Sequence, residues 1–239
     1  MARFRIGTSG WTYDSWKGCF YPDGFPKRKW LEKYAESFDT VELNATFYRG
    51  MPRSTFTGWH ERTPEGFLWA VKASRRITHI KRLVAPVAEV EQFFLPLGLL
   101  GEKLGPVLFQ LPPGLVFDRD VFRAFAELLP PGIRYALEGR DESWHTPSAL
   151  SELERSGMAN CVADTAGRHP ECHAVTADFA YVRLHGSQVL YESMYTEAEL
   201  EQWAARIHSW GVDASVYFDN TMWGHAPYNA LRLRELLCG

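Results

Sequence analysis

Eight short, mostly apolar segments recur along the chain, and most of the stretches between them show helical patterns. The segments are Phe4–Thr8, Thr40–Leu43, Phe67–Lys72, Val107–Leu111, Arg134–Glu138, Asn160–Asp164, Ala180–His185 and Ala214–Asp219. Short apolar segments of this kind are typical of parallel strands that are buried on both faces. The repetition therefore predicts an α/β protein built on a parallel sheet.

Helical spacing or capping signals mark seven stretches between or after these strands. They are Lys27–Ser37, Ser54–Arg62 with Ser54 as cap, Thr78–Leu100, Asp118–Leu129 with Asp118 as cap, Thr146–Ser156, Thr196–Trp210 with a capping box of Thr196 and Glu199, and Pro227–Leu237. Pro86 and Pro96 are expected to break or kink the third of them. The stretch Ala166–Phe179 is irregular, with room for one helical turn.

This alternation predicts one (β/α)8 barrel, a TIM barrel, that occupies residues 1–239 as a single domain with an abbreviated sixth helix. The alternative is an open, doubly wound sheet. That fold would place a Gly-rich phosphate turn after the first strand, and the motif GTSGW lacks its spacing.

The composition is that of an ordinary globular protein, with 46% hydrophobic and 23% charged residues. A formal net charge of −3 disfavours a protein that coats nucleic acid. The four cysteines form no Cys-x-x-Cys pair, which favours reduced thiols. The start MARFRIGTSGW shows no secretory signal, and no apolar run reaches the ~18 residues of a membrane span. We therefore expect a cytoplasmic protein with no membrane association.

Side-chain alternation along the strands predicts a group of polar residues that point into the barrel near the C-terminal ends of the strands. They are Glu42, Asn44, Lys72, Gln110, Glu138, Arg140, Asp164, Arg183, His185 and Asp219. Barrel enzymes build their active sites at this end. The alternative is a self-neutralising ring of ion pairs that closes the barrel.

We assign the acid–base roles to Glu42 and Glu138, with His185 assisting proton transfer. Lys72 and Arg183 are expected to keep both carboxylates ionised. The predicted ligand-binding residues are Asn44, Lys72, Gln110, Arg140, Asp164, Arg183, Asp219, Trp11 and Trp144.

Aromatic residues are frequent in the loops that follow the strands. They are Trp11, Trp16, Trp144, Trp223, Phe47, Tyr48, Tyr191 and Tyr195. Rings above a polar floor suit a ligand with a flat or partly apolar face, such as a sugar or a nucleobase. Packing of the long loops against themselves is an equally good explanation.

A cofactor is not indicated by any strong motif, although a divalent metal is possible. Glu138, Asp164, His185 and Asp219 form a mixed oxygen and nitrogen set that would suit Mn, Mg or Zn. The set holds only one histidine, and His169, Cys172 and His173 form a weak motif. We therefore assign no metal ligand.

Seven stretches of the sequence form a characteristic set: IGTSGWTYDSWKGCFYP, FDTVELNATFYRGMP, FLWAVKASRRITH, LGPVLFQLPPGL, YALEGRDESWH, YVRLHG and VYFDNTMWGHAPYNA. They resemble the YecE-like family, a domain family of unknown function (domain of unknown function 72). The resemblance spans nearly the whole chain in order and implies a TIM-barrel fold. It implies no reaction, so it assigns no catalytic residue.

The charged residues predicted at the C-terminal ends of the strands favour an enzyme that performs acid–base chemistry, either hydrolysis or isomerisation, on a small polar ligand with an anionic group. A sugar, a sugar phosphate or a nucleotide fits this description. The alternative is a non-catalytic binder of nucleotides or nucleic acid, in which Arg75 and Arg76 join Lys72 in a phosphate-binding rim. A partner-binding scaffold is a third possibility. The sequence identifies neither the substrate nor the oligomeric state.

Overall fold

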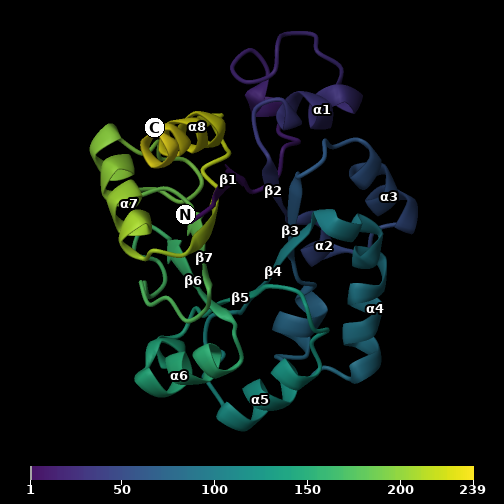
Figure 1. Ribbon diagram of the computed structural model, residues 1–239, viewed down its shortest axis with the longest axis vertical. Coiled ribbons are helices and arrows are strands. Elements are labelled where there is room, and N and C mark those ends of the chain that lie inside the picture. The colour runs from purple at the N-terminus through teal and green to yellow at the C-terminus, as the bar shows by residue number, and fades with distance from the viewer. Residues whose placement is uncertain (1) are drawn as a thin grey trace.

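The computed structural model describes residues 2–239 and shows parallel strands surrounded by helices (Figure 1). The strands are β1 (Phe4–Thr8), β2 (Thr40–Leu43), β3 (Leu68–Lys72), β4 (Leu104–Gln110), β5 (Tyr135–Glu138), β6 (Ala159–Asp164), β7 (Phe179–Leu184) and β8 (Asp213–Phe218). They form one eight-stranded sheet in the order β1-β8-β7-β6-β5-β4-β3-β2, with every pair parallel. The predicted (β/α)8 barrel is thus confirmed, and the strand bounds differ from prediction by at most three residues.

The barrel closes between β1 and β2 along a narrow seam. A single parallel bridge joins Ser9 to Glu42 there. Gly7 faces Thr40 across the seam, and a Cβ atom on Gly7 would lie 2.3 Å from the carbonyl oxygen of Thr40. Only a residue without a side chain permits the two strands to approach this closely.

Replacing Gly7 with alanine is expected to destabilise the protein by about 1–3 kcal/mol, because the backbone of β2 must move away from the added methyl group. Gly58 is the matched control, since its site inside a helix has nothing within 4 Å of an added Cβ. Gly58→Ala is expected to stabilise the protein by about 0.5–1 kcal/mol. Urea midpoints of the two variants test this, and equal midpoints would contradict the role of Gly7.

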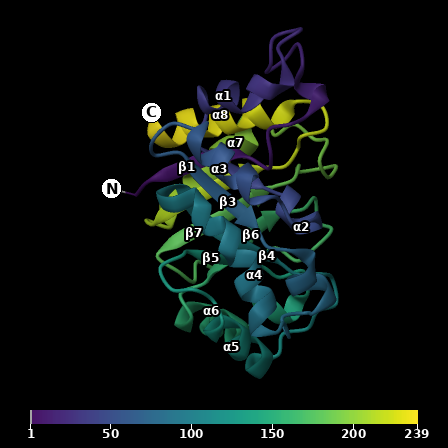
Figure 2. The same ribbon diagram turned by 90° about the vertical axis from the view of Figure 1, so that its right-hand side faces the viewer.

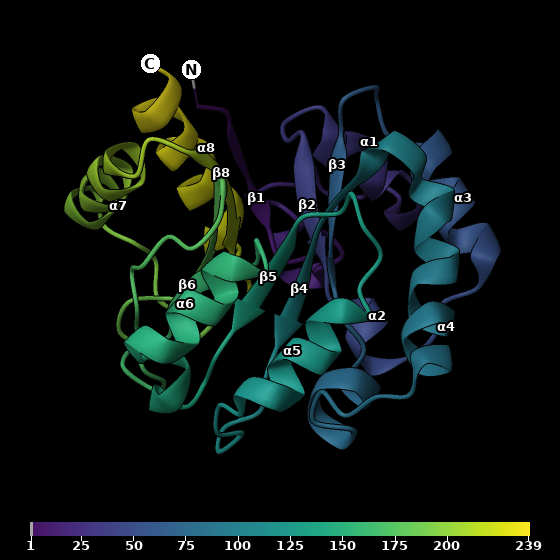
Figure 3. The same ribbon diagram turned by 60° about the horizontal axis from the view of Figure 1, so that its bottom comes forward.

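Helices cover the outside of the barrel. They are α1 (Trp30–Ala35), α2 (Ala45–Tyr48), α3 (Arg53–Glu61), α4 (Val87–Leu97), α5 (Arg119–Glu127), α6 (Pro147–Arg155), α7 (Glu197–Ser209) and α8 (His225–Cys238). Figure 2 shows α1 and α8 at one edge of the molecule and α5 and α6 at the other. In Figure 3, α8 lies against β1 and beside α7, and this brings the two chain ends together.

The predicted caps are confirmed at Asp118, which accepts hydrogen bonds from two backbone N–H groups, and at Thr196, which forms the capping box with Glu199. The prediction of Ser54 as a cap was wrong, because α3 begins after Pro52. The long helix expected at Thr78–Leu100 is interrupted before Pro86, where a π-helical turn (Arg76–Ile80) precedes α4. The abbreviated sixth helix is reduced to turns between β6 and β7.

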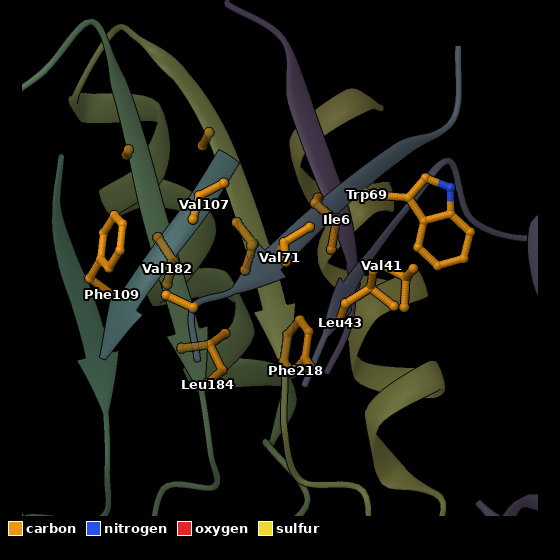
Figure 4. Close-up of a cluster of buried hydrophobic side chains, with 14 of the residues drawn as sticks. Ile6, Val41, Leu43, Trp69, Val71, Val107, Phe109, Val182, Leu184 and Phe218 are labelled. Atoms are coloured by element: carbon orange, nitrogen blue, oxygen red, sulfur yellow. The ribbon is translucent and has the colours of Figure 1, made fainter. Parts of the chain in front are cut away.

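Strand alternation divides the apolar side chains into two layers. Val41, Trp69, Phe109, Val182 and Phe218 face the helices, as the strand side chains in Figure 4 show. The layer inside the barrel consists of Ala70, Leu108, Ala136, Ala159, Cys161, Ala163, Phe179, Tyr181 and Tyr217. The polar residues predicted to point inward continue this inner layer toward the C-terminal ends of the strands.

Asp164 is the exception, and its predicted direction was wrong. Cys161 and Ala163 point into the barrel, so Val162 and Asp164 belong to the outer face of β6. The Asp164 carboxylate accepts a hydrogen bond from the hydroxyl of Tyr195 at 2.8 Å. In the sequence NCVAD, Asn160 and Asp164 share one face and the small residues Cys161 and Ala163 share the other, so the polar residues suggested an inner face that the structure places outside.

Candidate functional site

A cavity of about 390 Å³ opens at the C-terminal ends of the strands. It is lined by Tyr13, Asn44, Phe47, Tyr48, Lys72, His79, Gln110, Arg140, Arg183, His185, Tyr191 and Asp219. Lys72 and Gln110 are the last residues of β3 and β4, so their side chains reach the cavity floor directly from the barrel. This is the end at which barrel enzymes bind their substrates.

A buried ion-pair network lies beneath the cavity, with Arg183 at its centre. Arg183 donates to Glu42 from Nη2 at 2.8 Å and from Nε at 2.9 Å. Its Nη1 atom donates to Glu138 at 2.8 Å. Both carboxylates and the guanidinium are almost fully buried, at 0–2% side-chain exposure. A single guanidinium therefore bridges the two glutamates to which the sequence analysis assigned the acid–base roles.

The hydrogen bonds of Glu42 leave little room for substrate. Besides Arg183, it accepts from the hydroxyls of Ser9 at 2.8 Å and Tyr181 at 2.7 Å. Burial acts to raise the pKa of Glu42 and of Glu138, but the charge of Arg183 together with the neighbouring cations and hydrogen-bond donors outweighs it and holds both below their usual range. Both carboxylates are therefore ionised and satisfied, and neither lines the cavity. This geometry favours a structural role for the two glutamates over the predicted acid–base pair.

The surroundings of Lys72 differ from those of the two glutamates, because its side chain lines the cavity. Its ammonium nitrogen lies 4.4 Å from the centre of the Phe47 ring. Within residues 2–239, no carboxylate oxygen lies within 4.0 Å of this nitrogen. Burial, followed by repulsion from Arg183, lowers the pKa of Lys72 to about 8. These surroundings therefore favour the uncharged amine of Lys72 more than water would.

Arg140 presents a second positive charge to the cavity. Its Nε atom donates to Glu138 at 2.8 Å, and its side chain is 17% exposed. In the part of the chain that the structure describes, its two Nη groups have no hydrogen-bond acceptor. They are therefore available to an anionic group of a ligand.

His185 and Asp219 form the third polar element of the cavity wall. The Nδ1 atom of His185 lies 2.8 Å from Asp219 Oδ2, and its Nε2 atom lies 3.2 Å from Arg183 Nη1. Both imidazole nitrogens therefore have neighbours within the protein. Asp219 is the only carboxylate among the residues that line the cavity.

Sequence reasoning missed two residues that line the cavity, Tyr13 and His79. His79 comes from the π-helical turn after β3, and such single turns are frequent at functional sites. Burial and the charge of Lys72 lower the pKa of His79 to about 4, so its imidazole is neutral at pH 7. The sequence places His79 inside an apparent helix, and only the interruption of that helix turns it toward the cavity.

Three residues that were predicted to bind ligand lie away from the cavity. Asp164 is on the outer face of β6. Trp11 packs edge-on against Trp69 among the helices, and Trp144 packs against Phe117. The loop-packing explanation therefore holds for these two tryptophans. Of the aromatic residues named from the sequence, Phe47, Tyr48 and Tyr191 line the cavity.

Asn44 and Gln110 do line the cavity, as predicted. Asn44 donates to Glu42 at 3.2 Å, while its buried Oδ1 atom has no hydrogen-bond partner in residues 2–239. Gln110 donates to the carbonyl oxygen of Leu111 at 3.0 Å. The Asn44 oxygen is thus an acceptor that a ligand hydroxyl can satisfy.

The described residues contain no group of three or more His, Cys, Asp and Glu side chains arranged to hold a metal ion. Arg76 pairs with Glu89 at 2.8 Å and lines a separate cavity beside α4, so it does not join Lys72 in one rim. No helix within residues 2–239 combines the length and apolar character needed to cross a membrane.

Comparison with known proteins identifies the family of this chain. The sequence profile described as "Protein of unknown function DUF72" matches residues 5–238. This chain belongs to the DUF72 family. The resemblance to the YecE-like proteins is confirmed, since that name denotes the same family.

Relatives of this DUF72 chain cover nearly its whole length. It is 30% identical to the UPF0759 protein YunF of Bacillus subtilis, over 97% of this chain and 94% of YunF. The crystal structure of a DUF72 protein from Thermotoga maritima has a TM-score of 0.86 and 25% identity, covering 98% of this chain and 99% of that chain. A DUF72 structure from Enterococcus faecalis has a TM-score of 0.85 and 19% identity, covering 98% and 95%. These names carry no reaction, so the chemistry of the DUF72 site rests on its geometry.

Proposed function

We propose that this protein is an enzyme that binds a small polar ligand through an anionic group and performs acid–base chemistry on it. Lys72 holds and moves the proton, and Arg140 binds the anionic group. Asn44 and Gln110 contact ligand hydroxyls, and Asp219 orients His185 in the wall. Of the two reactions considered from the sequence, isomerisation by proton transfer fits best, because a single amine that titrates near neutral pH can both accept and return a proton.

One observation carries this proposal: the cavity-facing amine of Lys72 has no carboxylate partner, although three carboxylates belong to the same cluster. A buried lysine with a purely structural role would be expected to have a paired charge or hydrogen-bond acceptors for its ammonium group. Glu42 and Glu138 are engaged by Arg183 and Arg140 instead. Lys72 therefore stays available to a ligand, at some expense in stability.

Replacing Arg140 with methionine is expected to weaken binding of glycerol 3-phosphate by about 10- to 100-fold, because one or two charge-assisted hydrogen bonds to the phosphate are lost. Arg232→Met is the matched control, since Arg232 is an ion-paired arginine on α8 away from the cavity. Thermal stabilisation by increasing ligand measures both affinities. An equal affinity in the two variants would contradict the assignment of Arg140.

The same measurement separates this proposal from nucleic-acid binding. A binder of nucleic acid is expected to hold single-stranded oligonucleotides with a steep dependence on salt. A small-molecule enzyme is expected to respond to sugar phosphates and not to oligonucleotides. If the wild type binds oligonucleotides, loses this binding in Arg140→Met and shows no response to small phosphates, the protein is a nucleic-acid binder and the proposed enzyme function is wrong.

A further inference from the structure

The amine of Lys72 has the surroundings of a nucleophile as well as those of a proton carrier. Its residue is 8% exposed, and its nitrogen lies over the Phe47 ring at 4.4 Å. The cavity wall around it carries the cations Arg140 and Arg183 and the carboxylate of Asp219. Burial and the charge of Arg183 lower the pKa of Lys72, whereas Glu138, Glu42 and Asp219 act in the opposite direction and do not offset them. An amine that is desolvated and placed beside other cations loses its proton more readily, and the free amine attacks carbonyl carbons.

A second buried lysine in the same protein shows what a structural lysine looks like. Lys103 is 6% exposed, and its Nζ atom donates to the carbonyl oxygens of His60 and Thr63 at 2.6 Å each. These bonds anchor the ammonium to the end of α3. Lys72 has neither such carbonyl partners nor an ion pair within the described residues, and its amine faces open volume.

We infer that Lys72 forms a covalent imine with an aldehyde or ketone that carries an anionic group, which Arg140 holds. This inference rests on the proposed function and names its substrate class. The free size of the cavity, about 390 Å³, accommodates a carbonyl compound with the dimensions of a triose phosphate. An iminium withdraws electrons from the adjacent carbon and so makes the proton on that carbon easier to remove. Because the iminium nitrogen has no free lone pair, the covalent form of Lys72 activates the carbon, and the proton passes to another group of the cavity wall, the carboxylate of Asp219.

The step balances without an oxidant or a reductant. Lys72 Nζ, as the free amine, bonds to the carbonyl carbon, and the π electrons of the C=O bond move to oxygen, which takes a proton. The nitrogen loses a proton, the C–O bond breaks with oxygen leaving as water, and the nitrogen lone pair completes the C=N bond. One amine, one carbonyl and one proton give one iminium ion and one water molecule.

Reductive trapping with sodium cyanoborohydride tests the inference on the full chain. Dihydroxyacetone phosphate is the probe, and glycerol 3-phosphate, which has the phosphate but no carbonyl, is its matched control. We expect one reduced adduct, mapped by mass spectrometry to Lys72, and a rate that is half-maximal near pH 8, as the lowered pKa of Lys72 requires. Ordinary exposed lysines react with a midpoint of about 10.4. Excess glycerol 3-phosphate is expected to slow the trapping at Lys72.

Lys72→Arg separates this inference from the proposed function, because arginine keeps the positive charge and lacks the nucleophilic amine. The variant is expected to form no adduct at the site while it still binds glycerol 3-phosphate. If the wild type binds glycerol 3-phosphate but Lys72 reacts no faster than surface lysines, the imine is overturned and the anion site stands. If neither phosphate compound stabilises the wild type, the proposed function itself fails.

Discussion

Replacing Arg183 with methionine is expected to lower the free energy of unfolding by about 3–5 kcal/mol at pH 7. The substitution leaves Glu42 and Glu138 buried without the guanidinium that bridges them. Arg232→Met is the control, because it removes an arginine ion pair at the solvent-exposed surface, where little change is expected. Urea denaturation of the wild type and both variants measures the difference.

As the pH falls, the free energy of unfolding of the wild type and that of Arg183→Met are expected to change in opposite directions. In the wild type, Arg183 holds the pKa of Glu42 and of Glu138 below their unfolded values, so their contribution is present at pH 7 and is lost as pH falls through the folded pKa. In Arg183→Met, the buried carboxylates bind protons more readily in the folded state than in the unfolded state. The difference in the free energy of unfolding between the wild type and Arg183→Met is therefore expected to decrease as the pH falls from 7 to 5. A difference that is small and constant with pH would show that the network is not structural.

In contrast to Arg183→Met, replacing Lys72 with methionine is expected to affect activity much more than stability. Loss of the acid–base amine is expected to slow the exchange of the carbon-bound proton of dihydroxyacetone phosphate with D₂O by about 10²–10⁴-fold. Stability is expected to stay within about 1 kcal/mol of the wild type, because the unpaired lysine does not hold the fold together. Proton NMR in D₂O and urea denaturation measure the two effects.

Lys103→Met serves as the matched buried-lysine control. It removes the two hydrogen bonds to the carbonyl oxygens of His60 and Thr63, so it is expected to lose stability while exchange activity per folded molecule is retained. Exchange that is equally fast in the wild type and in Lys72→Met would exclude Lys72 as the proton carrier. The absence of exchange in the wild type, with both aldehyde and keto sugar phosphates, would contradict proton transfer at this site.

The degree of burial does not distinguish the charged residues that pair within this protein from the lysine that faces the cavity without a paired charge. Glu42, Lys72, Glu138 and Arg183 are all nearly inaccessible and all come from strands of the barrel. From the sequence, Glu42 and Glu138 were assigned as the acid–base pair, and Lys72 was assigned to ligand binding and to keeping both carboxylates ionised. Hydrogen-bond partners reverse these roles, since they satisfy both glutamates and leave the lysine amine facing the cavity.

The sequence by itself determined the barrel and the end at which the cavity lies. Apolar strand runs and helix caps are local patterns, and the period of two along a strand places Lys72, Gln110, Arg183 and His185 on its inner face. The pattern was insufficient at Asp164, because Asp164 shares the outer face of β6 with Asn160 while small residues fill the inner face, and which face is inner depends on the neighbouring strands. It was also insufficient at Trp11 and Trp144, because a loop ring packs against whichever apolar surface it reaches.

Only the tertiary structure decided which charges pair with one another. Ion pairing depends on distances of a few ångströms between side chains from strands that are far apart in sequence, as between Glu42 on β2 and Arg183 on β7. The attraction between charges in a buried site depends strongly on those distances and on water access, and neither follows from residue order. The turn that brings His79 to the cavity likewise depends on how the chain leaves β3 and packs beside α4. The sequence therefore placed the charged residues at one end of the barrel, and the packing of the barrel left Lys72 as the charge without an ion pair.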